Sequence, residues 1–260
     1  MSDTLIPAAT ILLLRDAPAF EVLMVKRHAD IAFAGGALVF PGGRIDAGDG
    51  AGAWPEFCDG LDVCPEKERA PRIAAIREAF EETGVLLARR NGAMIGAGEA
   101  ERLEPWRKRV EADDRLFLEM IGKEGMSLAV DELHLFSRWR PGAEVAHRRY
   151  DTWFFAAKTP EKQHASPDGR EATEIVWTGP QAVLADAEAG RRRMIFPTRR
   201  NVELLAQSDS AEAVFDFAAR RDRSPIEPRI VERDGVKVLT LPEGRGYPVT
   251  EEPLERAMRF

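Results

Sequence analysis

Arg-Glu-Ala-Phe-Glu-Glu-Thr-Gly-Val, residues 77–85, is the most informative segment of this chain. Apolar side chains before and within it recur three and four positions apart, which predicts an α-helix over residues 72–83. Pro71 suits the first turn of that helix, because proline lacks the amide hydrogen that a first turn leaves unpaired. Gly84 suits its end, because glycine readily adopts the left-handed conformation that stops many helices.

Three carboxylates are concentrated on this helix, at Glu78, Glu81 and Glu82. Since side chains three and four positions apart share one face of a helix, the three point the same way and repel each other. Arg77 lies four residues before Glu81 and can pair with it. A divalent ion such as Mg²⁺, which prefers carboxylate oxygen, would neutralise the rest. The alternative is an acidic helix face exposed to solvent, which a short motif alone does not exclude.

The segments before the helix predict a β-hairpin and a glycine loop. Residues 5–14 and 20–27 are apolar runs joined by a turn that contains Pro18, as in a hairpin. Residues 38–40 form a further short strand that ends at Pro41-Gly42-Gly43. The two glycines let the backbone approach a ligand closely. Backbone groups of this loop would therefore face the same metal ion and phosphates as the acidic helix.

The remainder of the chain mixes strands and helices without an internal repeat. Together with the early hairpin, this mixture predicts an α/β or α+β fold in one domain. Residues 46–70 are rich in turns, with one or two helical turns expected at 53–61. We expect strands at 85–88, 133–140, 150–157 and 174–178, a hairpin at 229–241 around Asp234-Gly235, helices at 180–189, 197–208 and 210–221, and two more helices within 99–123.

Composition narrows the class of protein. The chain has 260 residues, a net charge of −7 and 31% charged residues, which leaves no basic footprint for nucleic acid. Cys58 and Cys64 are too few for a disulfide framework at this length, so both are interpreted as thiols of a surface insertion. The sequence shows neither a signal peptide nor an apolar run that could span a bilayer, which predicts a cytoplasmic protein with no membrane partner. Homodimer formation stays open.

Residues 77–85 resemble the second half of the Nudix hydrolase box, Gly-x5-Glu-x7-Arg-Glu-U-x-Glu-Glu-x-Gly-U, where U is apolar and Ala79 takes the first U position. The first half resembles Gly43-x5-Asp49, with Asp where the family has Glu. The spacing departs from the pattern, because 27 residues separate Asp49 from Arg77 instead of seven. We interpret this as an insertion of about twenty residues, which loops tolerate at small entropic cost. Whether Asp49 replaces the usual glutamate in function is left open.

The resemblance implies both a fold and a set of roles. The expected fold is a Nudix-type α/β/α sandwich with a mixed β-sheet, one domain over residues 1–260. Insertions are expected at about 50–70 and 99–125, and a C-terminal extension of helix and hairpin at about 197–260. By position, Glu78 and Glu82 would bind Mg²⁺ or Mn²⁺, Glu81 would be a further ligand or the base that activates water, Arg77 would orient a glutamate, and the carbonyl of Gly43 or Gly42 would complete the coordination.

Several segments resemble the CoA and acyl-CoA diphosphatase branch of the family. The run from Val22 to Arg27, then Gly36, then Val39 to Gly43 is similar to the upstream CoA signature of that branch, except that Ala32 stands where the signature has a second Arg. The implied reaction cleaves CoA or acyl-CoA to 3′,5′-ADP and (acyl-)phosphopantetheine. The alternatives are a Nudix hydrolase of ADP-ribose, NADH or another dinucleotide, and a non-catalytic nucleotide-binding module.

Further charged residues are candidates for contacts with a small nucleotide substrate. Arg27, Gly42 and Arg44 are expected to bind it, since the planar donors of arginine suit phosphate. Arg148 and Arg149 are equally consistent with phosphate binding and with an ordinary surface position. Nudix enzymes often carry an extra acid before a later strand, and Glu174 is the candidate here. The nearby Glu171 is interpreted as a solvent-exposed acid at the edge of that strand.

Overall fold

The computed structural model describes residues 5–30, 34–145 and 149–258. Its centre is a seven-stranded sheet in the order β10-β2-β1-β9-β8, with β3 paired to β2 and β4 paired to β1. β1 and β9 run parallel, whereas the other pairs are antiparallel, so the sheet is mixed as expected. The strands are β1 (Ile6–Arg15), β2 (Glu21–Arg27), β3 (Leu38–Val39), β4 (Gly42–Arg44), β8 (His134–Trp139), β9 (Tyr150–Lys158) and β10 (Ala172–Thr178).

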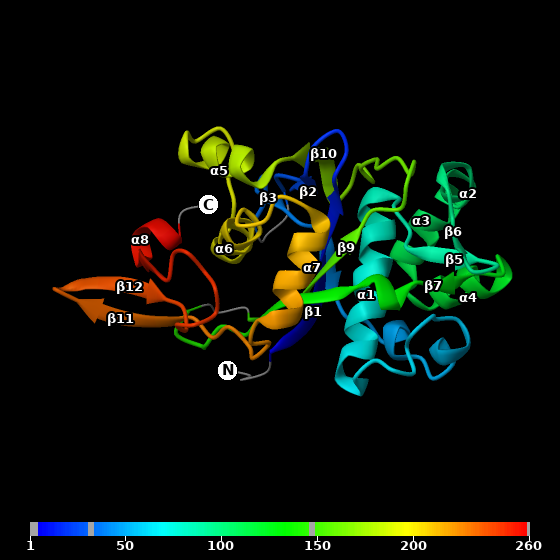
Figure 1. Ribbon diagram of the computed structural model, residues 1–260, viewed down its shortest axis with the longest axis horizontal. Helices are drawn as coiled ribbons and strands as arrows, with labels where there is room; N and C mark the ends of the chain where they lie inside the picture. Colours follow the sequence, from blue (N-terminus) through cyan, green and yellow to red (C-terminus); the bar gives the residue numbers. More distant parts are fainter. Residues whose placement is uncertain (1–4, 31–33, 146–148, 259–260) are drawn as a thin grey trace.

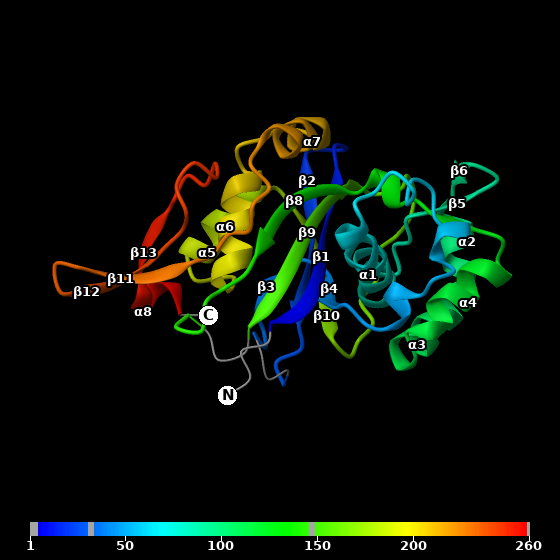
Figure 2. The same ribbon diagram turned by 90° about the horizontal axis from the view of Figure 1, so that it is seen from below.

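Helices cover both faces of this sheet (Figures 1 and 2). On one face lies α1 (Glu66–Thr83), and on the other lie α5 (Pro180–Glu188), α6 (Phe196–Leu205) and α7 (Ala211–Arg220). Side chains alternate between the faces of a strand, so Ile11 and Leu13 of β1 pack into the core beneath α1, and Leu12 packs into the core beneath α6 and α7. The predicted α/β/α sandwich is confirmed.

The two expected insertions pack together on the outer side of α1. The 3₁₀ turn Gly48–Gly50 leads into the first insertion, which contains a second 3₁₀ turn, Trp54–Glu56. The second insertion contains α2 (Ala97–Arg102), α3 (Glu104–Ala112) and α4 (Arg115–Lys123). They are joined through the Trp54 indole, which donates to the Gly48 carbonyl at 2.8 Å and packs against Phe117 with ring centroids 5.7 Å apart. A small sheet of β5 (Ala88–Arg90), β6 (Ala93–Met94) and β7 (Ser127–Leu128) lies beside them, followed by a 3₁₀ turn at Val130–Glu132.

The C-terminal extension forms the predicted hairpin and two elements that the sequence did not indicate. β11 (Arg229–Arg233) and β12 (Val236–Thr240) are joined by Asp234 and Gly235, whose φ angles of 50° and 77° are those of a tight hairpin turn. β13 (Glu251–Pro253) pairs with β12, and α8 (Leu254–Ala257) follows. The indole of Trp139 lies 3.1 Å from the Tyr247 hydroxyl and fixes the extension to the end of β8.

Three local expectations were wrong. The helix begins at Glu66, so Pro71 lies inside α1 and its first turn is instead preceded by Pro65. Pro71 is buried against the core, which offsets the one backbone hydrogen bond that its ring removes. Residues 85–87 are buried and bond to the Gln163 side chain and the Ala129 amide instead of to a strand, so the strand expected at 85–88 starts only at Ala88. The segment expected to form two helices forms three. No helix in the described ranges is long and apolar enough to cross a membrane.

Candidate active site

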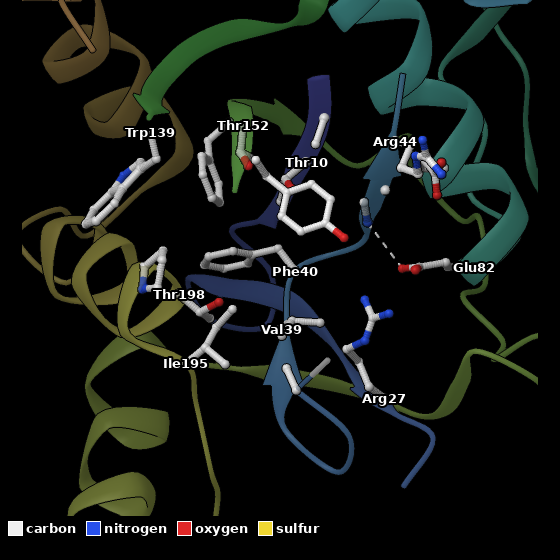
Figure 3. Close-up of a pocket in the computed structure, with 18 of the residues that line it drawn as sticks. Thr10, Arg27, Val39, Phe40, Arg44, Glu82, Trp139, Thr152, Ile195 and Thr198 are labelled. Carbon is white, nitrogen blue, oxygen red and sulfur yellow. Dashed lines mark hydrogen bonds between the residues drawn. The ribbon is translucent and has the colours of Figure 1, made fainter. Parts of the chain in front are cut away.

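A pocket of about 740 Å³ lies between α1, the central sheet and the C-terminal extension. One end, called here the charged end, is lined by Glu78, Glu81, Glu82 and Glu171 together with Arg27 and Arg44. The other, called here the apolar arm, is lined by Trp139, Phe154, Ile195, Phe196, Leu239 and Ala257. Figure 3 shows Arg27, Arg44 and Glu82 on one side of the pocket and Trp139, Ile195 and Thr198 on the other.

The floor of the pocket is a row of residues on neighbouring strands. Arg44 of β4 is paired with Ala8 of β1, Ala8 with Thr152 of β9, and Thr152 with Trp139 of β8. All four line the pocket. Small side chains occupy the middle of the row, so a ligand can lie across the sheet from the charged end to the apolar arm.

The glycine loop touches the acidic helix, as its residue types predict. A Cβ atom on Gly43 would lie 2.6 Å from a carboxylate oxygen of Glu78, a distance that only glycine avoids. The amide of Gly42 donates to Glu82 at 3.3 Å. Both carboxylates are buried, with Glu78 8% and Glu82 4% exposed. In the described part of the chain, Glu82 forms no direct ion pair with lysine or arginine, and the more distant charge of Arg27 lowers its pKa.

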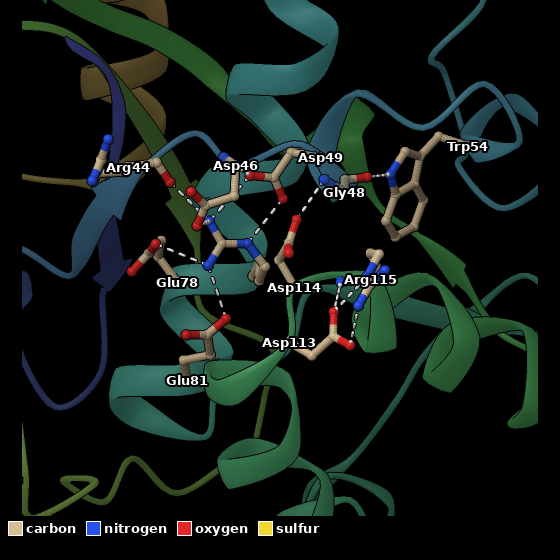
Figure 4. A network of polar contacts seen from close by, with 11 residues as sticks. Arg44, Asp46, Gly48, Asp49, Trp54, Glu78, Glu81, Asp113, Asp114 and Arg115 are labelled. Carbon is tan, nitrogen blue, oxygen red and sulfur yellow. Dashed lines mark hydrogen bonds and ion pairs between the residues drawn. The ribbon is translucent and has the colours of Figure 1, made fainter.

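Arg77 is the centre of a buried network, and Figure 4 labels four of the residues that it contacts, Arg44, Asp49, Glu78 and Glu81. Its Nη1 lies 2.9 Å from Glu78 and 2.8 Å from Glu81, which confirms the pairing expected from the four-residue spacing. Nη2 donates to the Arg44 carbonyl at 2.8 Å and thereby holds β4 against α1. A planar guanidinium with five donors can serve all these acceptors at once, which a lysine ammonium cannot.

Asp49 lies beside Arg77 in the structure, although 27 residues separate the two in sequence. Its two carboxylate oxygens accept from Nε and Nη2 of Arg77 at 2.9 and 3.1 Å. Asp49 is 1% exposed and also accepts from the Asp46 amide at 2.8 Å. The insertion therefore begins after Asp49 and leaves the contact between the two halves of the motif intact. Asp49 binds Arg77 and does not line the pocket.

Burial raises the pKa of each helix carboxyl. Desolvation is the largest cause for Glu78, whose pKa is about 8, and for Glu81, whose pKa is about 7; Arg77 lowers both pKa values but less strongly. The pKa of Glu82 is raised well above its usual value, first by burial and then by the charge of Glu78. A buried carboxylate is stable in its ionised form only when a cation compensates it. Arg77 beside Glu78 and Arg27 near Glu82 lower these pKa values without offsetting the effect of burial.

Comparison with known proteins identifies this arrangement. Residues 59–198, more than half of the chain, match the sequence model of the NUDT19 Nudix domain. The chain belongs to this family of Nudix hydrolases. The chain is 27% identical over 278 residues to the acyl-coenzyme A diphosphatase NUDT19 of Xenopus laevis, an alignment that covers 90% of this chain and 72% of the relative. It is 32% identical over 205 residues to the Homo sapiens protein of the same name, covering 63% of this chain and 54% of that one.

A solved structure shows the same fold. The crystal structure of a NUDIX hydrolase from Alicyclobacillus acidocaldarius superposes with a TM-score of 0.70 at 23% identity, over 83% of this chain and 97% of that one. At this identity the likeness concerns the fold alone. It includes the layers and the mixed sheet that position the Nudix helix α1.

The donors at the charged end fit a divalent metal ion. Nudix hydrolases generally use one, and Glu78 and Glu82 offer carboxylate oxygens beside the backbone of Gly42 and Gly43. Among the described residues, no three acidic, His or Cys side chains alone enclose a metal site.

Of the two acids near β10, the structure places Glu171 and not the predicted Glu174 in the lining of the pocket. Glu174 points away from the pocket and pairs with Arg192 at 2.9 Å, because it lies on β10, where alternate side chains face opposite sides of the sheet. Glu171 lines the pocket instead, and its charge raises the pKa of Glu78 and Glu82. Asp168 accepts from the Glu171 amide at 2.8 Å and orders this turn. The feature that could have identified Glu171 as a site residue is its position just before the strand that pairs with the end of β2.

Arg107 was not indicated by the sequence, yet it connects the second insertion to the Nudix helix. It is 3% exposed, and its guanidinium donates to the Glu81 carbonyl at 3.0 Å and to the Ser166 carbonyl at 3.0 Å. Glu81 lies in the last turns of α1, and Ser166 lies in the segment that leads to Glu171. Arg107 thus holds the two acidic elements of the pocket at a fixed separation.

The predicted substrate-binding arginines differ in position. Arg27 and Arg44 both line the pocket, and the Arg27 Nε is buried without a hydrogen-bond partner among the described residues. Arg149 lines a smaller hollow of about 280 Å³ that adjoins the apolar arm. Ala32 and Arg148 lie outside the described residues.

Proposed function

We propose that this chain hydrolyses the diphosphate bond of CoA or acyl-CoA with Mg²⁺ or Mn²⁺, releasing 3′,5′-ADP and (acyl-)phosphopantetheine. The observation that carries the proposal is one pocket with a charged end suited to a diphosphate and an apolar arm suited to a non-nucleotide group. The curated relatives named acyl-coenzyme A diphosphatase support the choice of substrate.

At the charged end, different side chains bind the diphosphate and the cation. Arg27 offers an unpaired donor and Arg44 a second guanidinium, which together can bind the diphosphate oxygens. The Gly42 amide and the carboxylates of Glu78 and Glu82 lie at the same end of the pocket, where a divalent cation would be held between protein and substrate. When bound, that cation neutralises the charge of the diphosphate and of the developing transition state.

Glu81 is the proposed general base. Its carboxylate lines the pocket, and the 2.8 Å contact with Arg77 fixes its orientation. With a pKa of about 7, it is matched to accept a proton near neutral pH. The oxygen of one water bonds to one phosphorus, and the bridging P–O bond breaks with its electron pair leaving on the other phosphate. The water proton passes to Glu81 and then to solvent.

Incubation of the purified chain with CoA and Mg²⁺, followed by chromatography of the products, tests this proposal. We expect release of 3′,5′-ADP that stops when EDTA removes the cation. Absence of 3′,5′-ADP at every metal concentration would rule out CoA as substrate. Replacement of Glu82 by Gln, which keeps the shape of the side chain, should remove most turnover.

A second candidate is hydrolysis of ADP-ribose, NADH or another dinucleotide by the same residues. Ala32 favours it, because the CoA signature has an arginine at that position. A panel of these substrates ranked by kcat/KM separates the two candidates, since specificity is the ratio of these values.

Three broader expectations stay predictions. We propose that residues 1–260 form one domain, which is supported by the two cores that share the central sheet. A cytoplasmic location is still predicted from sequence alone, and homodimer formation stays open. A role without nucleic acid is consistent with the net charge of −7.

A further inference from the structure

The first turn of α6 lines the pocket and carries hydrogen-bond donors. Its residues Ile195, Phe196, Pro197 and Thr198 all belong to the lining. Ile195 is the N-cap residue, and its apolar side chain cannot accept a hydrogen bond from the turn. Within the described ranges, the amides of Phe196 and Thr198 donate to no acceptor of the protein. Since the first amides of a helix are satisfied by a cap, by water or by a ligand, this turn can receive an oxygen atom of a bound molecule.

The side chain of Thr198 adds a third donor at the same place. Thr198 is 3% exposed, yet its hydroxyl forms no hydrogen bond with the residues that the structure describes. Figure 3 shows Thr198 on the α6 side of the pocket, across from Arg27 and Glu82. A buried hydroxyl is normally hydrogen-bonded, because burial without a partner costs free energy. Two amides and one hydroxyl therefore form a group of donors that a ligand oxygen can satisfy.

Buried polar contacts hold this turn in place. Asn201, which is 0% exposed, donates to the Pro197 carbonyl at 3.0 Å. The side-chain carbonyl of Asn201 accepts from the Ser137 hydroxyl of β8 at 2.8 Å and from the Tyr247 hydroxyl at 3.1 Å. These contacts fix α6 to the central sheet and to the C-terminal extension. The donors are thus preorganised, and a ligand does not have to order them.

The charge of the pocket restricts what can bind to these donors. A helix N-terminus attracts anions. However, the described lining contains eight acidic side chains and three arginines, and none of these charges comes from β8, β9, α6, β12 or α8. The negative excess disfavours a second anionic group, which would also lack a cation at this end of the pocket. A neutral acceptor such as an amide carbonyl needs only the hydrogen bonds that the turn supplies.

We propose that Thr198 and the first-turn amides of α6 bind an amide carbonyl of pantetheine, the non-nucleotide part of CoA. Thr198 is then a specificity-determining residue. This inference rests on the proposed function for the identity of the substrate. Pantetheine carries amide groups in an otherwise largely apolar chain, which matches a group of donors set in the apolar arm. ADP-ribose has no amide carbonyl, so the same donors favour CoA over ADP-ribose.

Thr198→Val removes the hydroxyl and keeps the shape of the side chain. With CoA and Mg²⁺, KM should rise about threefold to tenfold, the effect of one neutral hydrogen bond, because the contact is equal in the bound substrate and the transition state and kcat is therefore unchanged. Thr198→Ser retains the hydroxyl and should keep the wild-type KM. An unchanged KM in Thr198→Val, or an equal rise in Thr198→Ser, would overturn the assignment.

Thr159→Val is the matched control for this experiment. The hydroxyl of Thr159 is also buried without a partner among the described residues, and Thr159 does not line the pocket. Its replacement should leave KM unchanged. A rise in KM equal to that of Thr198→Val would show that loss of any buried hydroxyl has this effect, and the proposal would be wrong.

Titration calorimetry with the two products separates this inference from the proposed function. Wild type and Thr198→Val are titrated with 4′-phosphopantetheine and with 3′,5′-ADP in Mg²⁺, without turnover. If Thr198→Val binds only 4′-phosphopantetheine more weakly, by about threefold to tenfold, the site is supported even when the wild type cleaves no CoA, and only the proposed reaction fails. If it binds only 3′,5′-ADP more weakly, the nucleotide occupies this end of the pocket and the inference is wrong. Unchanged affinity for both products overturns it as well.

Discussion

The charged end and the apolar arm of the same pocket are built in opposite ways. The three glutamates of the charged end lie within five consecutive residues of α1, 78–82, beside a two-glycine loop, and are held by the buried guanidinium of Arg77. The apolar arm is assembled from β8, β9, α6, β12 and α8, which lie far apart in sequence. A reaction that needs exact charge placement is encoded locally, whereas the shape that receives the rest of the substrate arises only when distant elements pack.

The largest expected effect is on kcat, and it tests whether the charged end carries out the hydrolysis. Glu81→Gln removes the proposed base but keeps the size of the side chain, so kcat should fall by about 10² to 10⁴, the usual contribution of general base catalysis. KM should change little. Stopped assays of 3′,5′-ADP release measure this. A variant that retains most of its kcat would move the base to another residue, with Glu171 the first candidate.

The next effect concerns stability, because Arg77 neutralises three buried acids. Arg77→Met leaves Asp49, Glu78 and Glu81 without their cation, and loss of one partner from a buried ion pair costs about 3–5 kcal/mol of unfolding free energy. Urea denaturation followed by circular dichroism gives the value. Arg115→Met is the control, since Arg115 pairs with Asp113 in an exposed position and its loss should change stability little. Equal effects in the two variants would contradict the network.

A smaller effect, on kcat/KM, distinguishes Glu171 from Glu174, the two acids near β10. Glu171→Gln should lower kcat/KM about tenfold or more, because Glu171 lines the pocket beside the carboxylates that we propose bind the metal. Glu174→Gln should leave kcat/KM unchanged, because Glu174 pairs with Arg192 outside the pocket. If Glu174→Gln lowered kcat/KM more than Glu171→Gln did, Glu174 would be the extra acid, as the sequence predicted.

The smallest effect is the pH dependence of metal-induced stabilisation. In the metal-free protein, the pKa of Glu78 rises from 4.5 to about 8, so the folded state holds a proton that the unfolded state releases. Stability therefore falls as pH increases from about 4.5 to about 8 and then levels off. Mg²⁺ favours the ionised carboxylates and should raise Tm more at about pH 8.5 than at about pH 5.5. Thermal melts with Mg²⁺ and with EDTA show whether it does; a shift independent of pH would contradict the assignment.

The sequence predicted the charged end better than the arm for physical reasons. Helical spacing placed the three glutamates and the contact of Arg77 with Glu81, and the paired glycines indicated a close backbone approach. The contact of Asp49 with Arg77 depends on how the insertion folds, so spacing in sequence could not establish it. The position of Glu171 in the pocket depends on the register of β10 against β2, and the contacts of Arg107 depend on the packing of α3 on α1. Neither can be read from the sequence. Tertiary contacts alone determine the positions of β13 and α8 and the wall of the apolar arm in the C-terminal extension.

Binding of Mn²⁺, followed by electron paramagnetic resonance of the free ion, tests most directly whether the charged end is a divalent-cation site. The measurement uses the wild type, Glu82→Gln and the control Glu174→Gln, with no substrate turnover required. Wild type and Glu174→Gln should bind Mn²⁺ with the same affinity, and Glu82→Gln should bind at least about tenfold more weakly, since a carboxylate ligand is lost. Equal affinity in all three proteins would contradict the site described for α1.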